Sequence, residues 1–541
     1  METKIYNSIA ILLFSVLLLA SCRSSDTDNN LIGKQTQVKI NLTGTEFANA
    51  DTPSPVASIN HKGLSESRII QRQSILVSPS SFITVELAPD TSLNTIASIS
   101  KNLNTTAAIS GDPIAAGMKF RVIAYSQNNG SYQAHQDYTI GQSGEALKLD
   151  GGRTYDIIVY SYGVNTLPII SANELVNIGN ATVSYDDTNR DFMYQKVSYT
   201  PDGNISNNTL NIKLRHKLAQ INTTIHSVGL GDITNITNGL LTPHYNDGVF
   251  PLSSATLSGR NTLTSGAALN FLSSGFPGTT ITAEPILMNA DTNGNLAGGF
   301  SADISIAGIN KTISLPNSFK ITPGNKSNLT INLMKCGAYI GPNNDRANYK
   351  EFMCHNLGAD TSVDAFTPSA AIHGAKYQWG ANTNETGRYI SQTDDQSNSG
   401  NISGWSSSSK PNGSWSDTNK TANDPCPTGY RVPTYEQWKA VIQNNNVEMV
   451  GSGTDDVNNY TTAIYFKNPS NIRTLMLPFA GYRNSFEGIL KQRGSYGNYR
   501  SSNVNGTTDD YSYHLGIYNG DNVNISNSPK NLGMSIRCIK E

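Results

Sequence analysis

The sequence has few charged residues, and its tryptophans and cysteines are confined, with one exception, to the C-terminal part. Charged residues make up 15% of the 541 residues, and the formal net charge is −2. There is therefore no basic field that would attract nucleic acid. All four tryptophans and every cysteine except Cys22 follow Lys335. One continuous domain would not be expected to show such a break, so we place a domain junction near Lys335.

Long hydrophobic runs are also absent, apart from one near the start. Residues 9–20 are apolar except for Ser15, and a run of this length is too short to span a bilayer comfortably. It is typical of a signal peptide. The run Leu19-Ala20-Ser21-Cys22 then matches a lipobox, with cleavage between Ser21 and Cys22. An ordinary signal peptide followed by a chance cysteine is the alternative.

The lipobox predicts how the mature chain is anchored. The Cys22 thiol would carry diacylglycerol, and the amine that cleavage exposes would carry a further chain such as palmitate. Two or more acyl chains anchor a protein stably, whereas one does not. We therefore expect residues 1–21 to be a signal peptide and residues 22–34 to be a polar tether. The protein would be a surface-exposed lipoprotein of the cell outer membrane.

The rest of the chain is predicted to be mainly β. Residues 37–42 alternate apolar and polar side chains, as a half-buried strand does. Asp150-Gly151-Gly152 lies between two alternating runs and is typical of a hairpin turn. Strands at this spacing, with turn residues between them, predict β-sandwiches.

Residues 35–335 resemble the fimbrillins, the family of type V pilins. The segments that carry the resemblance are Gly117–Val122, the pair Tyr132 and Tyr138, Leu149–Tyr155, Leu214–Ile221 and Pro323–Leu333. The resemblance implies two transthyretin-like β-sandwich domains, at residues 35–205 and 206–335.

The resemblance also implies a mechanism of assembly. Fimbrillins travel as lipoproteins until a trypsin-like protease cuts after a basic residue, which removes the first strand and opens a groove for a strand of another pilin subunit. Such donor-strand insertion gains affinity from main-chain hydrogen bonds and specificity from side-chain pockets. Here Gln37–Leu42 would be the displaced strand, and Arg68 or Arg72, in the loop after it, would be the processing site. The alternative is that both arginines are merely exposed loop residues.

A short helix and a disulfide are predicted near the end of the chain. Thr434 and Gln437 form a T-x-x-Q capping box before a helix that ends at residues 444–446. A disulfide from Cys426 to Cys538 would tie the start of this helix to the last strand. The signal peptide favours it, because it places the chain in an oxidising compartment. The alternative is two unpaired buried cysteines.

The other two late cysteines, Cys336 and Cys354, are expected to form a second disulfide. A metal site is the alternative for these residues. The cysteines show no C-x-x-C spacing, and His355 and His373 are isolated. We therefore predict no metal site.

Residues 336–541 resemble the Fibrobacter succinogenes major paralogous domain, a secreted module. The motifs that carry this resemblance occur in order at Gly374–Trp379, Cys426–Trp438, Phe479–Arg483, Tyr499–Ser502 and Ser535–Cys538. The resemblance implies an α+β fold similar to that of C-type lectins and formylglycine-generating enzymes. Arg500 is a departure, because the family commonly has tryptophan there.

Binding is a better prediction for this last domain than catalysis. The sequence contains no H-E-x-x-H, G-x-S-x-G or phosphate-binding loop, and no cofactor is predicted. The candidate ligand-binding residues are Trp405 and Trp415, in the polar stretch 383–423, with Tyr499 and Arg500. Their ligand would be a glycan or protein on a host or bacterial surface. The alternative is that both tryptophans fold inward and fill the core under the polar stretch.

Together these features predict a minor subunit, an adhesin, at the tip of a fimbrium. A chain that ends in a disulfide-tied domain would accept a donor strand and have none to give. The main alternative is an outer-membrane lipoprotein that is never polymerised and binds glycan or protein while anchored. An enzyme is a third and more distant alternative.

Overall fold

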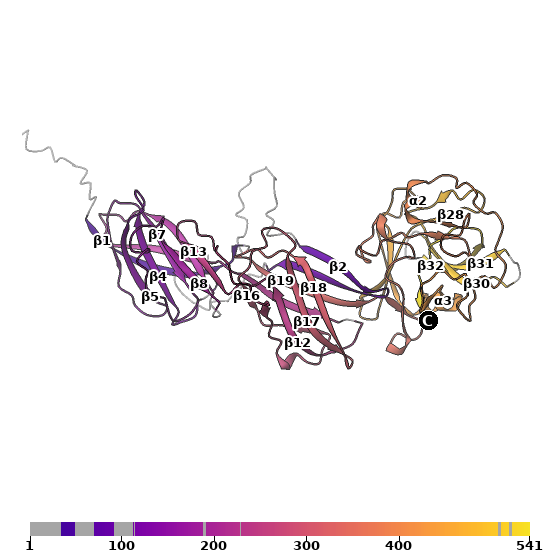
Figure 1. The fold of residues 1–541 in the computed structure, drawn as a ribbon, viewed down its shortest axis with the longest axis horizontal. Coiled ribbons are helices and arrows are strands. Elements are labelled where there is room, and N and C mark those ends of the chain that lie inside the picture. Colours follow the sequence, from indigo (N-terminus) through magenta and orange to yellow (C-terminus); the bar gives the residue numbers. More distant parts are fainter. Residues whose placement is uncertain are drawn as a thin grey trace, which may run out of the picture.

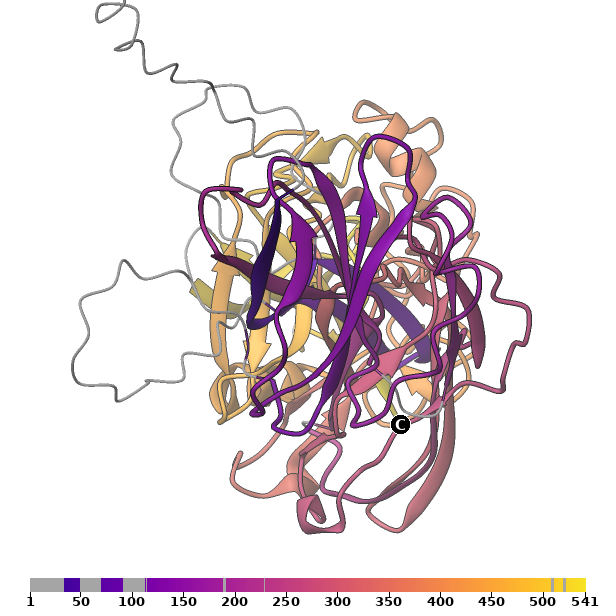
Figure 2. The same cartoon turned by 90° about the vertical axis from the view of Figure 1, so that its left-hand side faces the viewer.

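The computed structural model describes residues 34–48, 70–90, 112, 114–187, 191–227, 229–506, 510–518 and 522–541. The predictions for the signal peptide, Cys22, most of the tether and Arg68 lie outside these residues. The described chain is mainly β and forms three bodies in a row (Figure 1). Viewed along the row, the first body lies in front of the other two (Figure 2). Among the described residues, no helix has the length and hydrophobicity needed to cross a membrane.

The first body is built on a seven-stranded sheet with the order β5-β4-β7-β9-β10-β1-β6. Its core is formed by wholly buried aliphatic side chains such as Val122 and Val159. A two-stranded sheet, β8 and β13, packs beside it around a second, aromatic cluster that includes Phe192 and Phe250. The strands of this body are β1 (Gln35–Glu46), β4 (Lys119–Ser126), β5 (Tyr132–Thr139), β6 (Leu147–Asp150), β7 (Tyr155–Ser161), β8 (Thr182–Asp186), β9 (Met193–Tyr199), β10 (Asn207–His216) and β13 (Asp247–Pro251).

The second body is a sandwich of two sheets around one aliphatic core. One sheet has the order β15-β11-β19-β3-β2, with β16 also paired to β11, and the other has the order β14-β12-β17-β18. Its strands are β2 (Gln71–Ser78), β3 (Ser81–Pro89), β11 (Ala219–His226), β12 (Ile233–Thr242), β14 (Ala267–Ala268), β15 (Thr280–Thr282), β16 (Ile286–Met288), β17 (Gly298–Ile306), β18 (Ile309–Phe319) and β19 (Lys326–Lys335).

Three segments lie in a different body from the one expected for residues 35–205 and 206–335. The hairpin of β2 and β3 belongs to the second body, because β3 pairs with β19 and buries Ile83, Val85 and Leu87 in the second core. The strands β10 and β13 belong to the first body, where β10 pairs with β1 and β9 and β13 pairs with β8. The chain therefore passes between the two bodies more than once.

The third body contains two short helices and many short strands. Both predicted disulfides, Cys426–Cys538 and Cys336–Cys354, are present. The elements are α2 (Gln392–Ser397), α3 (Tyr435–Asn444), β20 (Gly337–Tyr339), β21 (Tyr349–Glu351), β22 (Lys376–Tyr377), β23 (Tyr389–Ile390), β24 (Tyr430–Arg431), β25 (Asn446–Val450), β26 (Ala463–Lys467), β27 (Arg473–Pro478), β28 (Tyr482–Arg483), β29 (Leu490–Lys491), β30 (Gly497–Val504), β31 (Tyr511–Tyr518), β32 (Asn522–Pro529) and β33 (Ile539–Lys540).

Helix α3 follows the local prediction. Thr434 is its N-cap, and the side chains of Thr434 and Gln437 form the reciprocal hydrogen bonds of a capping box. Trp438 and Val441 on its apolar face are buried in the third core. The capping box therefore fixes where the helix begins, and the buried residues fix which face of the helix packs against the core.

The turn of the β2–β3 hairpin joins the second body to the third. The backbone N–H groups of Cys354 and Cys336 donate to the carbonyl oxygens of Pro79 and Ser80, at 2.7 and 2.8 Å. The Ser80 hydroxyl donates to Glu351 at 2.7 Å and accepts from the Tyr430 hydroxyl at 2.9 Å. The turn is therefore part of the third body, although its strands belong to the second.

Candidate functional site

Strand β1 fills a space between β10 and β6 that we call the β1 slot. It runs parallel to β10, from Gln37 opposite Asn207 to Glu46 opposite Arg215. Over residues 35–38 it also pairs, antiparallel, with β6. Its inward side chains begin with Thr36 and Val38, which are 3% and 0% exposed. Main-chain hydrogen bonds on both sides and an inward apolar face therefore hold β1 in the sheet.

Arg72 is not in a loop, and that part of the prediction is wrong. It is the second residue of β2 and lies opposite Glu86 of β3. Its guanidinium is 3.8 Å from the carboxylate of Asp364 in the third body, and its side chain is half exposed. The Gln71 side chain beside it accepts from the backbone N–H of Lys320 at 2.6 Å. A cut after Arg72 would remove both contacts.

The four predicted ligand-binding residues of the third body are buried, so the prediction that these residues bind a ligand is wrong. Trp405 and Trp415 are 6% and 1% exposed, and Tyr499 and Arg500 are 0% exposed. Both indole N–H groups donate to backbone carbonyl oxygens at 2.9 Å. The tryptophans fold inward because the polar stretch 383–423 has few other large apolar side chains to fill the core beneath it. The alternative stated for them is confirmed.

Tyr499 and Arg500 have structural partners as well. The Tyr499 hydroxyl donates to a backbone carbonyl at 2.7 Å. The Arg500 guanidinium donates to the Ser512 hydroxyl at 2.8 Å and to the carbonyl oxygen of Lys530 at 3.0 Å. Burial lowers the pKa of Arg500 to about 9. These two side chains support the chain segments around them and do not face a ligand.

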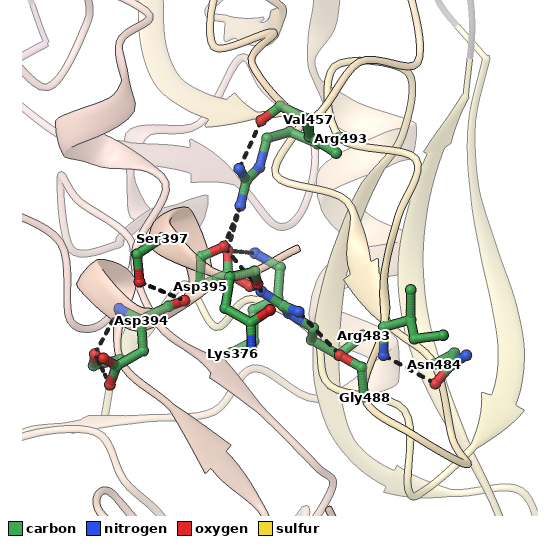
Figure 3. A network of polar contacts seen from close by, with 12 residues as sticks. Lys376, Asp394, Asp395, Ser397, Val457, Arg483, Asn484, Gly488 and Arg493 are labelled. Atoms are coloured by element: carbon green, nitrogen blue, oxygen red, sulfur yellow. Dashed lines mark hydrogen bonds and ion pairs between the residues drawn. The ribbon is translucent and has the colours of Figure 1, made fainter. Parts of the chain in front are cut away.

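A buried ion network lies beside α2 in the third body (Figure 3). The carboxylate of Asp395, on α2, is 2.8 Å from the Lys376 ammonium and 2.7 Å from the guanidinium of each of Arg483 and Arg493. All four side chains are at most 1% exposed. The two arginines also donate to backbone carbonyl oxygens, including those of Gly488 and Val457. The network therefore ties α2 to three other chain segments.

The electrostatics of this network favour support over catalysis. Burial raises the pKa of Asp395, but Lys376, Arg483 and Arg493 outweigh it and bring the pKa down to about 2. A carboxylate with so low a pKa is a poor general base near neutral pH. Burial lowers the pKa of Lys376 to about 8, but its ammonium is enclosed and cannot reach a substrate.

No metal site is found among the residues that the structure describes. In those residues, no group of three or more His, Cys, Asp or Glu side chains could hold a metal ion. The four cysteines of the third body are used in its two disulfides. His373 is wholly enclosed, and burial lowers its pKa well below the ordinary range, so its ring stays neutral.

Two features were missed by the sequence analysis. One is the network of Asp395, whose partners lie at positions 376, 483 and 493 and share no local pattern with it. The other is the insertion of the hairpin turn at Pro79 and Ser80 into the third body. Apolar and polar residues alternate along β3, but this alternation does not specify the sheet that the β2–β3 hairpin joins.

Comparison with known proteins gives similarity to solved structures only. No protein-family model and no curated protein matches the chain. A candidate cell adhesion protein from Bacteroides uniformis is 13% identical, with a TM-score of 0.29, over 41% of this chain and 92% of that one. A fimbrial assembly protein from Parabacteroides distasonis is 12% identical, with a TM-score of 0.26, over 40% and 88%.

A third similar structure covers more of the chain. It is a candidate cell adhesion protein from Bacteroides ovatus, 12% identical with a TM-score of 0.29, and the match covers 56% of this chain and 96% of that one. The described neighbours are thus adhesion and fimbrial proteins of Bacteroides and Parabacteroides. Their TM-scores are too low to assign this chain to a family.

Proposed function

We propose that this protein is a surface lipoprotein that acts as an adhesive subunit at the tip of a fimbrium. In this proposal β1 is removed after cleavage, and a strand of another subunit takes its place in the β1 slot. The third body is the part that contacts a surface glycan or protein. The β1 slot is the observation that supports this proposal most, because the strand that fills it can leave the sheet as one continuous piece.

The position of β1 in the chain supports this proposal. Residues 47–70 separate β1 from the next described strand, β2, which belongs to the second body. One cut between β1 and β2 therefore leaves every described strand intact. After the cut, β1 would be held by its contacts with β10, β6 and the core and by the backbone pair of Thr45 with Asp112. A departing β1 would expose main-chain groups of β10 and β6, which a new strand can satisfy.

Arg68 suits the cut better than Arg72. A cut after Arg68 comes before the first residue of β2, whereas a cut after Arg72 removes Gln71 and Arg72 from a paired strand. Proteases act on extended, accessible chain and not on paired strands. We therefore assign processing to Arg68 in this proposal.

The third body supports the position at the tip. Its strand β33 pairs with β24, and Cys538 beside it is bonded to Cys426. Ile539 is wholly buried in the core of the third body. A strand held in this way cannot leave to complete a neighbouring subunit.

Mass spectrometry of the N-terminus, on protein shed from the cell surface and on purified fimbriae, tests the proposal. We expect a new terminus directly after Arg68, with residues 22–68 absent. A terminus at acylated Cys22 in all of the material would overturn the proposal and leave an anchored surface binder. An R68Q variant is the matched test of the site, and R72Q is its control. R68Q should keep the lipidated terminus, whereas R72Q should be processed normally.

A further inference from the structure

The β1 slot has a charged end, formed by two cations of β10. The Glu46 carboxylate at the end of β1 is 3.0 Å from the Lys213 ammonium and 2.8 Å from the Arg215 guanidinium. Glu46 is the sole acidic residue of β1. The other outward residues of β10, Asn207, Thr209 and Asn211, are uncharged. When β1 leaves the slot, Lys213 and Arg215 therefore lose the carboxylate that joins them.

Glu46 reaches this place because the ladder shifts between Leu42 and Gly44. Alternate residues of a strand point to opposite faces, so without a shift Leu42 and Glu46 would share the inner face. The extra residue at the shift turns Glu46 outward, where it lies opposite Arg215. In β1, Glu46 thus comes four residues after Leu42, the last inward aliphatic residue.

We propose that Lys213 and Arg215 select the incoming strand by its carboxylate and so fix its register in the β1 slot. This inference rests on the proposed function, since it names the partner of the same slot. The partner is a strand with aliphatic residues at alternate positions, followed by an Asp or Glu. If that strand has no bulge, its carboxylate stands three residues after the aliphatic side chain opposite Ile212.

The geometry penalises the wrong register. A slip by one residue moves every side chain of a strand to the other face of the sheet. The carboxylate would then face the buried side chains of Ile212 and Leu214, which are 2% and 0% exposed. Burial of an ionised group without a partner is costly. The cations therefore favour the correct register, and the core disfavours the next one.

Strand exchange in the full-length protein tests the proposal. A recognition sequence for a specific protease is placed within residues 62–66, and the chain is cut there. A fluorescent peptide with the sequence of residues 34–48 is then added. Anisotropy then reports binding of the peptide in place of β1. We expect the E46Q peptide to bind roughly threefold to tenfold more weakly than the unchanged peptide, because it loses two partly exposed ion pairs. The difference should disappear in 1 M salt.

Variants of the protein identify the cations. The double variant K213Q/R215Q should bind both peptides equally, and K213E/R215E should prefer an E46K peptide. K119Q, which changes an exposed lysine of β4, is the control and should keep the preference for Glu46. If the peptides enter the slot but E46Q binds as well as the unchanged peptide, selection by Lys213 and Arg215 is overturned. Strand replacement in the β1 slot is then still supported. If no peptide enters the cut protein, the proposed function itself fails.

Discussion

Asp395 shows how one residue supports a whole body. Its carboxylate is enclosed with three cations, and no other carboxylate in the described part of the chain contacts the network. Removing one member of a buried ion pair leaves an uncompensated charge, which is strongly destabilising. Because Asp395 is shared, its loss would leave three such charges near one another.

We therefore predict that D395N lowers the unfolding free energy of the third body by roughly 3–5 kcal/mol. The neighbouring D394N is the matched control, since Asp394 is exposed and its substitution should cost less than about 1 kcal/mol. Urea denaturation of the full chain, followed by tryptophan fluorescence, measures both, because all four tryptophans lie in the third body. Equal stability of D395N and D394N would contradict a supporting role.

Acid provides a second readout of the same carboxylate. Its pKa lies at about 2 in the folded protein, below the ordinary value of 3.8. A depressed folded pKa stabilises the fold above the unfolded value, and this stabilisation is lost as the pH falls through the folded value. The stability of the third body should therefore hold down to about pH 4 and fall toward pH 2. In D395N, the part of this loss of stability that comes from protonation of Asp395 should be absent.

At the scale of elements, the local patterns in the sequence were the reliable ones. The capping box at Thr434 and Gln437 and the alternation of β1 each depend on neighbours in the chain, and the structure confirms both. The pairing of the cysteines was also predicted correctly. These features are specified over a few residues or by a scarce residue type.

Features that depend on distant partners were not predictable in this way. Apolar and polar residues alternate along β3, but the sheet that it joins is decided by the distant strand with which it pairs, here β19. The direction of Trp405 is likewise decided by how much core remains unfilled under the polar stretch. A sequence pattern shows which side chain is present but not the volume of core that is left for it to fill.

The two disulfides should contribute unequally to stability. They close loops with sequence separations of 112 and 18 residues, for Cys426–Cys538 and Cys336–Cys354. On the chain-entropy model, the longer loop contributes about 5 kcal/mol and the shorter about 3 kcal/mol. C426S/C538S should therefore melt at a lower temperature than C336S/C354S in calorimetry of the full chain. The opposite order would show that contacts around Cys336 outweigh loop entropy.

At the scale of the whole molecule, the β2–β3 hairpin joins the second and third bodies into one unit. Its turn carries Ser80, whose hydroxyl bonds to Glu351 and Tyr430. Phe82, just after the turn, stacks on Phe366 of the third body with ring centroids 5.1 Å apart. The joint is thus a packed interface and not a single flexible linker.

We predict that S80A loosens this joint, because the Tyr430 hydroxyl loses its acceptor and Glu351 loses one of its three donors, at a cost of about 1–3 kcal/mol. Hydrogen exchange at the amides of Cys336 and Cys354, which donate to the hairpin turn, should become faster. S78A is the control, since the Ser78 hydroxyl bonds to Ser81 within the hairpin itself. Unchanged protection at both amides in S80A would show that the backbone contacts alone hold the joint.

The same hairpin decides how the molecule would carry a mechanical load. β19 leads directly into the third body, and it lies between β3, antiparallel, and β11, parallel. A pull on the third body along β19 would load these two ladders in shear, so many hydrogen bonds would share the force at once. They would not be peeled open one after another. An adhesive body attached in this manner would stay connected under flow that detaches a body held by a simple tether.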